Sequence, residues 1–421
     1  MIKRQLEEWL LKNEHFPQII SLFGLRQTGK TTLMDKFRKE HYPEALHYPL
    51  YDLVVLRRYE SQPQEWVLEI EAMLKKFENE EKVLHVFIDE IQKIPAFFQA
   101  LQGLYEKYKG KIKFWTWGSS ARPLKRQRAE TLAGRSFAKI LWPFSQAELL
   151  QTESVVPLLF DPMALEKKMN FQIPRNYLNL FGKWIQQTML PEPCLQEDLQ
   201  LAQKILQSYK ATYLENEIRR ENLVQDIGAF DQFLSLAASE NTGIVNYASK
   251  AKALGMSPHT IRAYYGILED TFVCRSLPAY SKSLRVAISK SPKIYFSDTG
   301  LARFVSGELG LPVEGTAGFG FLLEGVAINE VFKQIEYYEL PWKTSYLRTR
   351  SGMEVDLILS QGAQKIAVEI KASRKISKED YQALLTLMEM DPEIKHGIVF
   401  SLQAAPFKLA KNIYNIPIWN L

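Results

Sequence analysis

The stretch GLRQTGKT, which begins at Gly24, matches the pattern G-x-x-x-x-G-K-[ST]. Gly24 and Gly29 allow backbone conformations that a side chain would hinder, so the loop amides can point at an anion and the next helix adds its N-terminal dipole. In this pattern Lys30 reaches the β- and γ-phosphates of a nucleotide and Thr31 coordinates Mg²⁺. The pattern also follows an apolar run and precedes a helical one, as this chemistry requires. The residues expected to bind the nucleotide are Gly24, Gln27, Thr28, Gly29, Lys30, Thr31 and Thr32.

Two carboxylates end the apolar stretch VLHVFIDE, residues 83–90. We expect Asp89 to hold Mg²⁺ through water and Glu90 to act as general base for the attacking water. Such a pair also occurs by chance at the end of a buried strand, but here it follows a phosphate-binding pattern. Together the two motifs predict ATP hydrolysis, with ATP and Mg²⁺ as cofactors.

Two further residues have a functional and a plain structural interpretation. Ser119 follows the strand-like run KFWTWG and could sense the γ-phosphate, or could belong to a simple strand-to-loop turn. Arg135 could act on a nucleotide across a subunit interface, because a guanidinium stabilises transition-state charge. That role would require a homo-oligomer. An arginine in a solvated loop is the simpler interpretation.

A second group of charged residues lies near the C-terminus, in GMEVDLILSQGAQKIAVEIKAS, residues 352–373. The stretch predicts strand, turn and strand. Glu369 and Lys371 share one face of the second strand because strand side chains alternate, and Asp356 comes from the first strand. Two carboxylates and a lysine on one sheet edge are what a Mg²⁺-dependent phosphodiester hydrolase needs. An ion pair on a solvated strand face is the alternative for Glu369 and Lys371.

The elements that must position these residues fall into three regions, and the predicted fold class is α/β. Strands alternate with helices through residue 120, which predicts a parallel, doubly wound sheet in a domain at 1–150. Residues 151–308 are largely helical. The stretch LGLPVEGTAGFG is rich in Gly and Pro, and a C-terminal α/β domain is expected over 309–421.

The middle region contains a predicted helix-turn-helix at 246–270, within a winged domain at about 241–300. Ser257 is a good N-cap and Pro258 fits the first helical position. We expect Tyr264 to be buried and Tyr265 to face outward. Five basic residues and no acidic one follow between 275 and 293, which is typical of a wing. The motif could contact a DNA backbone, or could be a structural lid or protein-contact module.

The motifs GLRQTGKTTL, FIDEIQKIP, WGSSARPL and TLAGRSFAKILWPFSQAEL resemble those of prokaryotic AAA-type ATPases that carry a C-terminal domain of unknown function. The resemblance continues in NYASKAKALGMSPHTIRAYYGILEDTFV, SPKIYFSDTGL and SGMEVDLIL. It implies nucleotide roles for Lys30, Thr31, Asp89 and Glu90, and favours Arg135 as a trans-acting finger. Trp117 departs from the threonine usual in the family, which affects the sensor assignment of Ser119. The C-terminal stretch resembles the PD-(D/E)XK nuclease superfamily, with Glu324 as its additional acid beside Asp356, Glu369 and Lys371.

Composition narrows the class of protein only slightly. The 421 residues are 46% hydrophobic and 24% charged, as in ordinary globular proteins, and the net charge of +5 neither demands nucleic acid nor excludes it. There is no apolar run of the roughly 18 residues that a membrane span needs, and the first residues lack the pattern of a signal peptide. A cytoplasmic protein with no membrane partner is expected. Two hypotheses follow: an ATP-driven motor or switch that acts on DNA through a nuclease domain, or a nucleotide-gated scaffold whose inert C-terminal domain binds a partner protein.

Overall fold

Five short apolar runs form the parallel sheet that carries the first predicted site. Because both faces of such a sheet are covered, its strands are continuous hydrophobic runs rather than alternating ones, as in IISLF and IKFWTWG. The strand order is β2-β3-β4-β1-β5, and every neighbouring pair is parallel. This confirms the parallel sheet predicted for the N-terminal region. The strands are β1 (Ile19–Phe23), β2 (Leu46–Pro49), β3 (Leu84–Asp89), β4 (Ile112–Gly118) and β5 (Ser136–Ile140).

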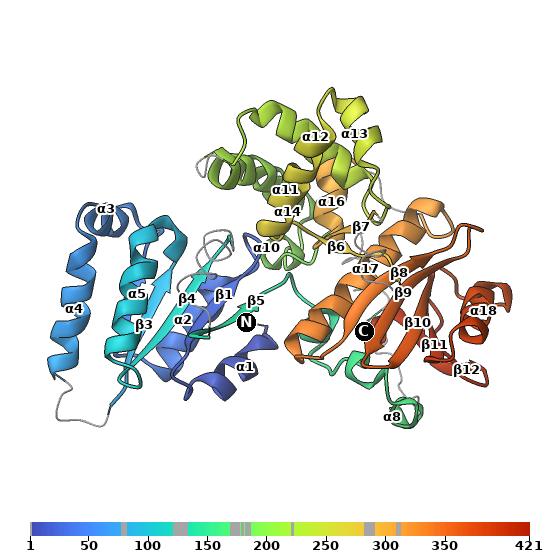
Figure 1. Ribbon diagram of the computed structural model, residues 1–421, viewed down its shortest axis with the longest axis horizontal. Coiled ribbons are helices and arrows are strands. Elements are labelled where there is room, and N and C mark those ends of the chain that lie inside the picture. Colours follow the sequence, from blue (N-terminus) through green and yellow to red (C-terminus); the bar gives the residue numbers. More distant parts are fainter. Residues whose placement is uncertain are drawn as a thin grey trace. The chain divides into compact units, whose positions relative to one another are not determined.

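The computed structural model describes residues 2–76, 82–120, 134–168, 177, 181, 187–219, 223–281, 291–308 and 313–421. The chain divides into two units, the first made of residues 3–142 and 270–272 and the second of residues 143–269 and 273–421 (Figure 1). The predicted division of the second unit at residue 308 stays a prediction. None of the helices in the described ranges is long and apolar enough to cross a membrane.

Helices in the first unit follow the strands in alternation, as the sequence indicates (Figure 1). Buried aromatic residues join the helices to one another and to the sheet: the ring centroid of Trp66 on α4 lies 4.2 Å from that of Phe97 on α5 and 6.3 Å from that of Phe114 on β4. The helices are α1 (Leu6–Asn13), α2 (Lys30–His41), α3 (Leu53–Ser61), α4 (Pro63–Lys76) and α5 (Pro95–Lys107), with a 3₁₀ turn at Ile91–Lys93.

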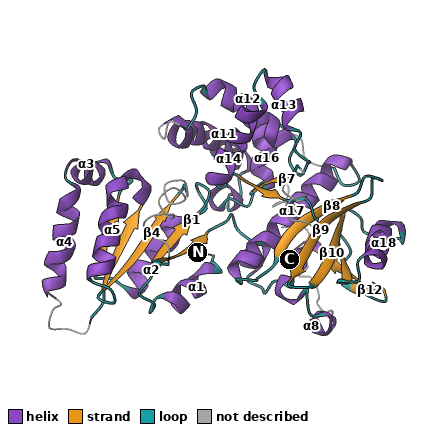
Figure 2. Cartoon of the chain, viewed as in Figure 1, coloured by secondary structure: helices purple, strands orange, loops and turns teal. Residues whose placement is uncertain are grey.

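Where it is described, the middle of the chain is mostly helical, with a two-stranded ribbon (Figure 2). Strands β6 (Cys274–Leu277) and β7 (Lys293–Phe296) pair antiparallel, so that Leu277 lies opposite Lys293. The helices and turns of this region are α7 (Gln146–Leu150), η2 (Val156–Leu158), α8 (Pro162–Lys168), α10 (Pro191–Cys194), α11 (Leu199–Tyr213), η3 (Leu214–Arg219), α12 (Ile227–Ser239), α13 (Tyr247–Leu254), α14 (Pro258–Asp270) and α16 (Thr299–Ser306).

The predicted helix pair is present as α13 and α14. Asn246 caps α13 by accepting a hydrogen bond from the Ser249 amide at 3.0 Å, and Gly255 ends it with φ of 65°. The prediction for the two tyrosines of α14 was wrong: Tyr265 is buried and Tyr264 is half-buried, whereas Ile261, Ile267 and Leu268 are buried. Phe233 of α12 packs against both tyrosines, and Tyr247 of α13 also packs against Tyr265, which buries its ring.

The basic run predicted as a wing is not a continuous exposed strip where it is described. Arg275 lies over the ring of Phe332 and pairs with Glu336 at 3.4 Å. Lys293 is buried in ion pairs. The other three basic residues, Lys282, Arg285 and Lys290, lie outside the described residues.

The C-terminal sheet is mixed, with the order β12-β13-β11-β10-β9-β8. Alternating side chains divide between two hydrophobic cores: Leu357 and Leu359 pack in the core that contains α17, whereas Ile358 packs in the core that contains α18. The elements are α17 (Ala317–Tyr337), β8 (Lys343–Arg348), β9 (Glu354–Gln361), β10 (Gln364–Lys371), η4 (Glu379–Tyr381), α18 (Gln382–Met390), β11 (Ile394–Ser401), β12 (Phe407–Ala410), β13 (Ile413–Pro417) and η5 (Ile418–Asn420).

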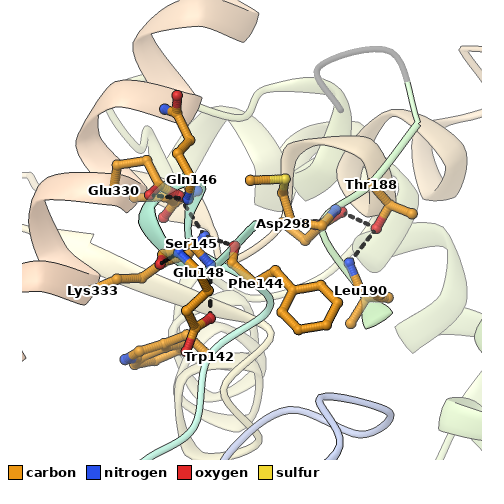
Figure 3. Close-up of polar contacts among 12 residues, drawn as sticks. Trp142, Phe144, Ser145, Gln146, Glu148, Thr188, Leu190, Asp298, Glu330 and Lys333 are labelled. Atoms are coloured by element: carbon orange, nitrogen blue, oxygen red, sulfur yellow. Dashed lines mark hydrogen bonds and ion pairs between the residues drawn. The ribbon is translucent and has the colours of Figure 1, made fainter. Parts of the chain in front are cut away.

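A buried ion pair on α17 holds the segment that follows residue 142 (Figure 3). Lys333 Nζ lies 2.7 Å from Glu330 Oε1 and donates to the Phe144 carbonyl at 2.8 Å. Glu330 Oε2 in turn accepts from the Gln146 amide at 2.9 Å. Residues 143–148 of the WPFSQAE motif, which lie in the second unit, are therefore explained by their contacts with α17. The motif anchors this segment to α17, and this structural role accounts for its residues without a catalytic one.

Asp298 forms a second buried anchor in Figure 3. Its carboxylate accepts from the Thr188 hydroxyl at 2.7 Å and from the Met189 amide at 2.6 Å. It also caps α16 through the Leu301 amide at 2.6 Å. These bonds satisfy the buried charge that the SDTG motif places inside the unit.

Candidate functional site

The loop between β1 and α2 has the backbone that an anion cradle requires. Gly24 has φ of 148°, and a Cβ there would lie 2.2 Å from the carbonyl oxygen of Leu141. Gly29 has φ of 86° and precedes α2, so the free amides of the first helical turn face the loop. Gln27 is exposed with φ of 60°. Position 24 therefore requires glycine, both for its backbone conformation and for its close approach to the Leu141 carbonyl.

Buried polar contacts hold this loop closed on itself. Lys30 Nζ donates to the carbonyls of Gly24 at 2.9 Å and Leu25 at 2.8 Å. The Thr28 hydroxyl donates to the Leu25 carbonyl at 3.0 Å. Arg4, which the sequence did not single out, donates to the Thr28 carbonyl at 2.7 Å. The lysine ammonium thus lies inside the curve of the loop, where phosphate oxygens would be its alternative acceptors.

Strand order brings the second motif to the loop. Strand β4 pairs with both β1 and β3, so the carboxyl ends of β1 and β3 lie at one edge of the sheet. There the Thr31 hydroxyl donates to Asp89 Oδ2 at 2.8 Å. The Trp117 indole donates to the Thr31 hydroxyl at 3.3 Å, so the residue that departs from the family pattern contributes to the site. Thr32 is exposed one position further on.

The electrostatics of Asp89 fit a cation ligand. The side chain is fully buried, and its Oδ1 has no hydrogen-bond partner among the described residues. Burial and the adjacent Glu90 raise the pKa of Asp89 to about 7, although Thr31, Trp117 and Lys30 act in the opposite direction. A carboxylate that is desolvated and lacks a partner for one oxygen is in a state that a divalent cation would stabilise. The residues therefore fit Mg²⁺ with a nucleotide.

Glu90 is held beside Asp89 by two polar neighbours. It has φ of 53°, an unusual conformation for a side chain larger than glycine. Its Oε2 accepts from the Ser119 hydroxyl at 3.2 Å and from the side-chain amide nitrogen of Gln92. A Cβ at Gly118 would lie 2.1 Å from the Gln92 side-chain oxygen, so this glycine leaves room for the contact. The structure thus places Ser119 against Glu90 and adds Gln92, which sequence reasoning missed.

Arg135 lies at the amino ends of the strands of the same sheet, opposite the ends that carry the loop. Strands β1 and β5 are parallel with Ile19 opposite Ser136, and the Ile19 amide donates to the Arg135 carbonyl at 2.9 Å. Arg135 is therefore at the amino end of β1, whereas the Gly24 loop follows its carboxyl end. Its guanidinium pairs with Glu106 on the surface. Arg135 does not belong to the loop site of its own chain, which leaves the trans role as a prediction.

The C-terminal residues predicted from the sequence come together. Leu357 on β9 pairs with Val368 on β10, which makes Asp356 and Glu369 neighbours on adjacent strands. Asp356 Oδ2 accepts from the Ile370 amide at 2.8 Å, and Lys371 Nζ lies 2.8 Å from Glu369 Oε2. Glu324 of α17 contributes the fourth group, because its charge and that of Asp356 interact.

Three residues that the sequence did not indicate belong to this cluster. Lys293 Nζ lies 3.0 Å from Glu324 Oε1 and 2.7 Å from Glu354 Oε1. The Tyr295 hydroxyl donates to Glu324 Oε1 at 2.6 Å. The sequence did not indicate Lys293 and Tyr295 because β7 lies far from the motif along the chain. We call the group formed by Lys293, Tyr295, Glu324, Glu354, Asp356, Glu369 and Lys371 the carboxylate–lysine cluster.

Burial sets the protonation of the cluster. Burial and Asp356 raise the pKa of Glu324 to about 7 and that of Glu369 to about 8. Burial opposes the charge on Lys293, but Glu324, Asp356 and Glu354 together raise its pKa. Across the described residues, no three His, Cys, Asp or Glu side chains are arranged to hold a metal ion. In the described conformation Lys293 and Lys371 pair with the carboxylates of the cluster, and Arg348 Nε lies 3.9 Å from Glu354 Oε2 at its margin.

Comparisons with known families divide the chain into three consecutive matches. Residues 17–150 match the model described as AAA domain. Residues 179–311 match Domain of unknown function (DUF8612), and residues 319–421 match Domain of unknown function (DUF4143). Together with the five-stranded parallel sheet, the first match makes the N-terminal region an AAA-type P-loop domain. Neither of the other two matches indicates a nuclease.

Relatives and solved structures resemble the chain only distantly. An uncharacterized protein of Methanocaldococcus jannaschii is 24% identical and aligns over 99% of this chain and 86% of its own length. An uncharacterized protein of Mycobacterium tuberculosis is 24% identical over 72% of this chain, and the match spans 62% of that relative.

Among solved structures, the ORC1 protein of Aeropyrum pernix in complex with DNA is 13% identical, with a TM-score of 0.27 over 72% of this chain and 91% of its own. Cdc6p from Pyrobaculum aerophilum is 12% identical, with a TM-score of 0.27 over 73% and 93% of the two chains. TM-scores this low carry no argument about function.

Proposed function

We propose that the N-terminal domain binds Mg²⁺–ATP in the Gly24 loop and hydrolyses it. The observation that carries this proposal is the contact between the Thr31 hydroxyl and Asp89 Oδ2 at 2.8 Å, beside an Asp89 Oδ1 that is buried and unpartnered. Thr31 and Asp89 would hold Mg²⁺, which supplies charge neutralisation at the phosphates. Lys30 exchanges its two carbonyl acceptors for phosphate oxygens.

Glu90 acts as the general base in this proposal. A base must reach the proton of the attacking water, and its orientation must be fixed before the reaction. The Ser119 hydroxyl at 3.2 Å and the Gln92 amide fix one oxygen of Glu90. The other oxygen can accept a proton from water. In this proposal Ser119 positions the base, and its contact with the γ-phosphate stays a prediction.

Phosphate release by the full chain tests the role of Glu90. Glu90→Gln should retain ATP binding and lower turnover at least about 100-fold, the usual contribution of a positioned base. The exposed Glu60 makes a matched control, because Glu60→Gln changes the same atoms away from the loop. Turnover by Glu90→Gln at the rate of the control would show that another group is the base.

For the C-terminal domain we propose a divalent-cation-dependent site for phosphodiesters, of the type that the PD-(D/E)XK resemblance implies. The supporting observation is the buried Glu369 Oε1, which has no hydrogen-bond partner among the described residues and lies beside Asp356. Asp356 and Glu369 would hold the cation, and Lys371 would position water. Under the motor hypothesis, DNA is the partner that this domain binds.

Nicking of plasmid DNA by the purified full chain, with Mg²⁺ or Mn²⁺, distinguishes this proposal from the scaffold hypothesis. Lys371→Ala should stop nicking, and so should Asp356→Asn. If wild type cuts neither DNA nor RNA, the C-terminal domain is an inert binding module and the nucleotide-gated scaffold is the better account.

A further inference from the structure

A single lysine joins carboxylates from two different elements in the carboxylate–lysine cluster. Lys293 belongs to β7, whereas Glu324 lies on α17 and Glu354 on β9. Its Nζ is 3.0 Å from Glu324 Oε1 and 2.7 Å from Glu354 Oε1. The side chain is only 5% exposed. Lys293 is therefore a desolvated cation at the point where carboxylates converge.

The strand that carries Lys293 is fixed against the cluster by a second contact. Tyr295 alternates with Ile294 on β7 and donates its hydroxyl to Glu324 Oε1 at 2.6 Å. Thus Glu324 Oε1 receives both an ammonium and a hydroxyl from the same strand. A divalent cation that uses this oxygen as ligand has to displace at least one of them.

The cluster also has coordinating capacity that its lysines leave unused. Lys371 contacts Glu369 through Oε2, whereas Glu369 Oε1 is buried and has no hydrogen-bond partner in the described part of the chain. Asp356 is next to it on β9 and interacts electrostatically with Lys293. Oxygen ligands of this kind suit Mg²⁺ and Mn²⁺. The cluster therefore combines the ligands of a cation site with an ammonium that competes for them.

We propose that Lys293 is a built-in competitor for a divalent cation at the carboxylate–lysine cluster. While its ammonium bridges Glu324 and Glu354, the cluster is neutralised from within and binds metal weakly. When Lys293 leaves, Asp356 and Glu369 bind the cation, and Glu324 Oε1 no longer has the ammonium as its partner. This inference rests on the proposed cation-dependent function of the C-terminal domain, and adds to it a residue that controls access.

Mn²⁺ binding to the full chain, measured by electron paramagnetic resonance without nucleotide, tests the competition. Lys293→Gln removes the ammonium and should bind Mn²⁺ at least tenfold more tightly than wild type. Lys293→Arg keeps a cation and should bind as wild type does. Adding Asp356→Asn to Lys293→Gln should abolish the gain. The N-terminal domain is identical in all four chains, so any Mn²⁺ that it binds does not affect the comparison.

The outcomes separate this inference from the proposed function on which it rests. If wild type binds Mn²⁺ as tightly as Lys293→Gln, the cation site exists but Lys293 does not compete for it. If neither chain binds Mn²⁺ at the cluster, both the inference and the cation-dependent function fail. If the gain survives Asp356→Asn, the ion binds elsewhere and the inference is wrong.

Removal of Lys293 leaves buried carboxylates unpaired, so folding provides a second readout. Should Lys293→Gln fold poorly, Lys293→Met preserves the apolar stem of the side chain. Mn²⁺ should raise the melting temperature of either variant by more than it raises that of wild type, because the ion replaces the missing charge. An equal increase in variant and wild type would contradict the competition.

Discussion

Replacing Asp89 by Asn should stabilise the N-terminal unit when metal and nucleotide are absent. The pKa of this buried carboxyl is raised from the usual 3.8 to about 7, so the folded chain favours its protonated form. A tenfold change in a protonation equilibrium corresponds to ~1.4 kcal/mol, and the full shift therefore lowers the unfolding free energy by about 4 kcal/mol at high pH. In the Asp89→Asn chain the side-chain oxygen can still accept from Thr31, and no buried carboxylate lowers the unfolding free energy.

The direction of the pH dependence follows from the same shift. The unfolded chain releases the Asp89 proton near pH 4, whereas the folded chain keeps it up to about pH 7. The unfolding free energy of wild type therefore falls as pH rises between these values and changes little above them. The advantage of Asp89→Asn should be below about 2 kcal/mol at pH 5 and should approach about 4 kcal/mol at pH 8.

Native-state hydrogen exchange of the β3 and β4 amides in EDTA, corrected for the intrinsic exchange rate at each pH, measures this difference within the first unit. Exposed Asp52 provides the control, because Asp52→Asn makes the same chemical change and asparagine also caps a helix. With Mg²⁺–ATP present, wild type should become more stable than Asp89→Asn, since the ligand stabilises mainly the chain that binds it well. An Asp89→Asn chain that is less stable than wild type at every pH would refute the reasoning.

Three other changes test separate parts of the account. Gly24→Ala places a Cβ 2.2 Å from a backbone oxygen and should weaken ATP binding at least tenfold by calorimetry, whereas Gly103→Ala, with no atom within 4 Å, should not. Lys333→Met leaves the buried Glu330 unpaired and should lower the unfolding free energy of the second unit by about 3–5 kcal/mol in hydrogen exchange; adding Glu330→Gln should recover much of that loss. Arg135→Ala should abolish an increase of ATPase rate per chain with protein concentration if the arginine acts in trans. A rate independent of concentration, from a species that light scattering shows to be monomeric, would exclude that role.

The first site was largely predictable because its chemistry is local. The glycines, Lys30 and Thr31 lie within one turn and the start of one helix, so their types and spacing alone predict the loop conformation that the structure shows. Asp89 required one further inference, that the carboxyl ends of parallel strands lie at the same edge. Gln92 was not predictable, because its contact with Glu90 depends on the space left by Gly118 on another strand.

The remaining features depend on packing between distant segments. Lys293 was assigned to an exposed basic wing because its neighbours in sequence are basic, but the packing of β7 against α17 places it among carboxylates. Tyr265 was expected to face outward, but Phe233 of α12 and Tyr247 of α13 pack against its ring and bury it. Likewise, the WPFSQAE motif is explained by Glu330 and Lys333, more than 180 residues further along the chain.

Calorimetric titration of the full chain with Mg²⁺–ATP, for wild type and Lys30→Ala side by side, tests the central claim most directly. Lys30 is the ammonium that lies inside the loop, bonded to the carbonyls of Gly24 and Leu25. The account predicts one ATP per wild-type chain, and an affinity at least 100-fold lower for Lys30→Ala. Equal affinity in the two chains, or no binding by wild type, would contradict the assignment of this loop as the nucleotide site.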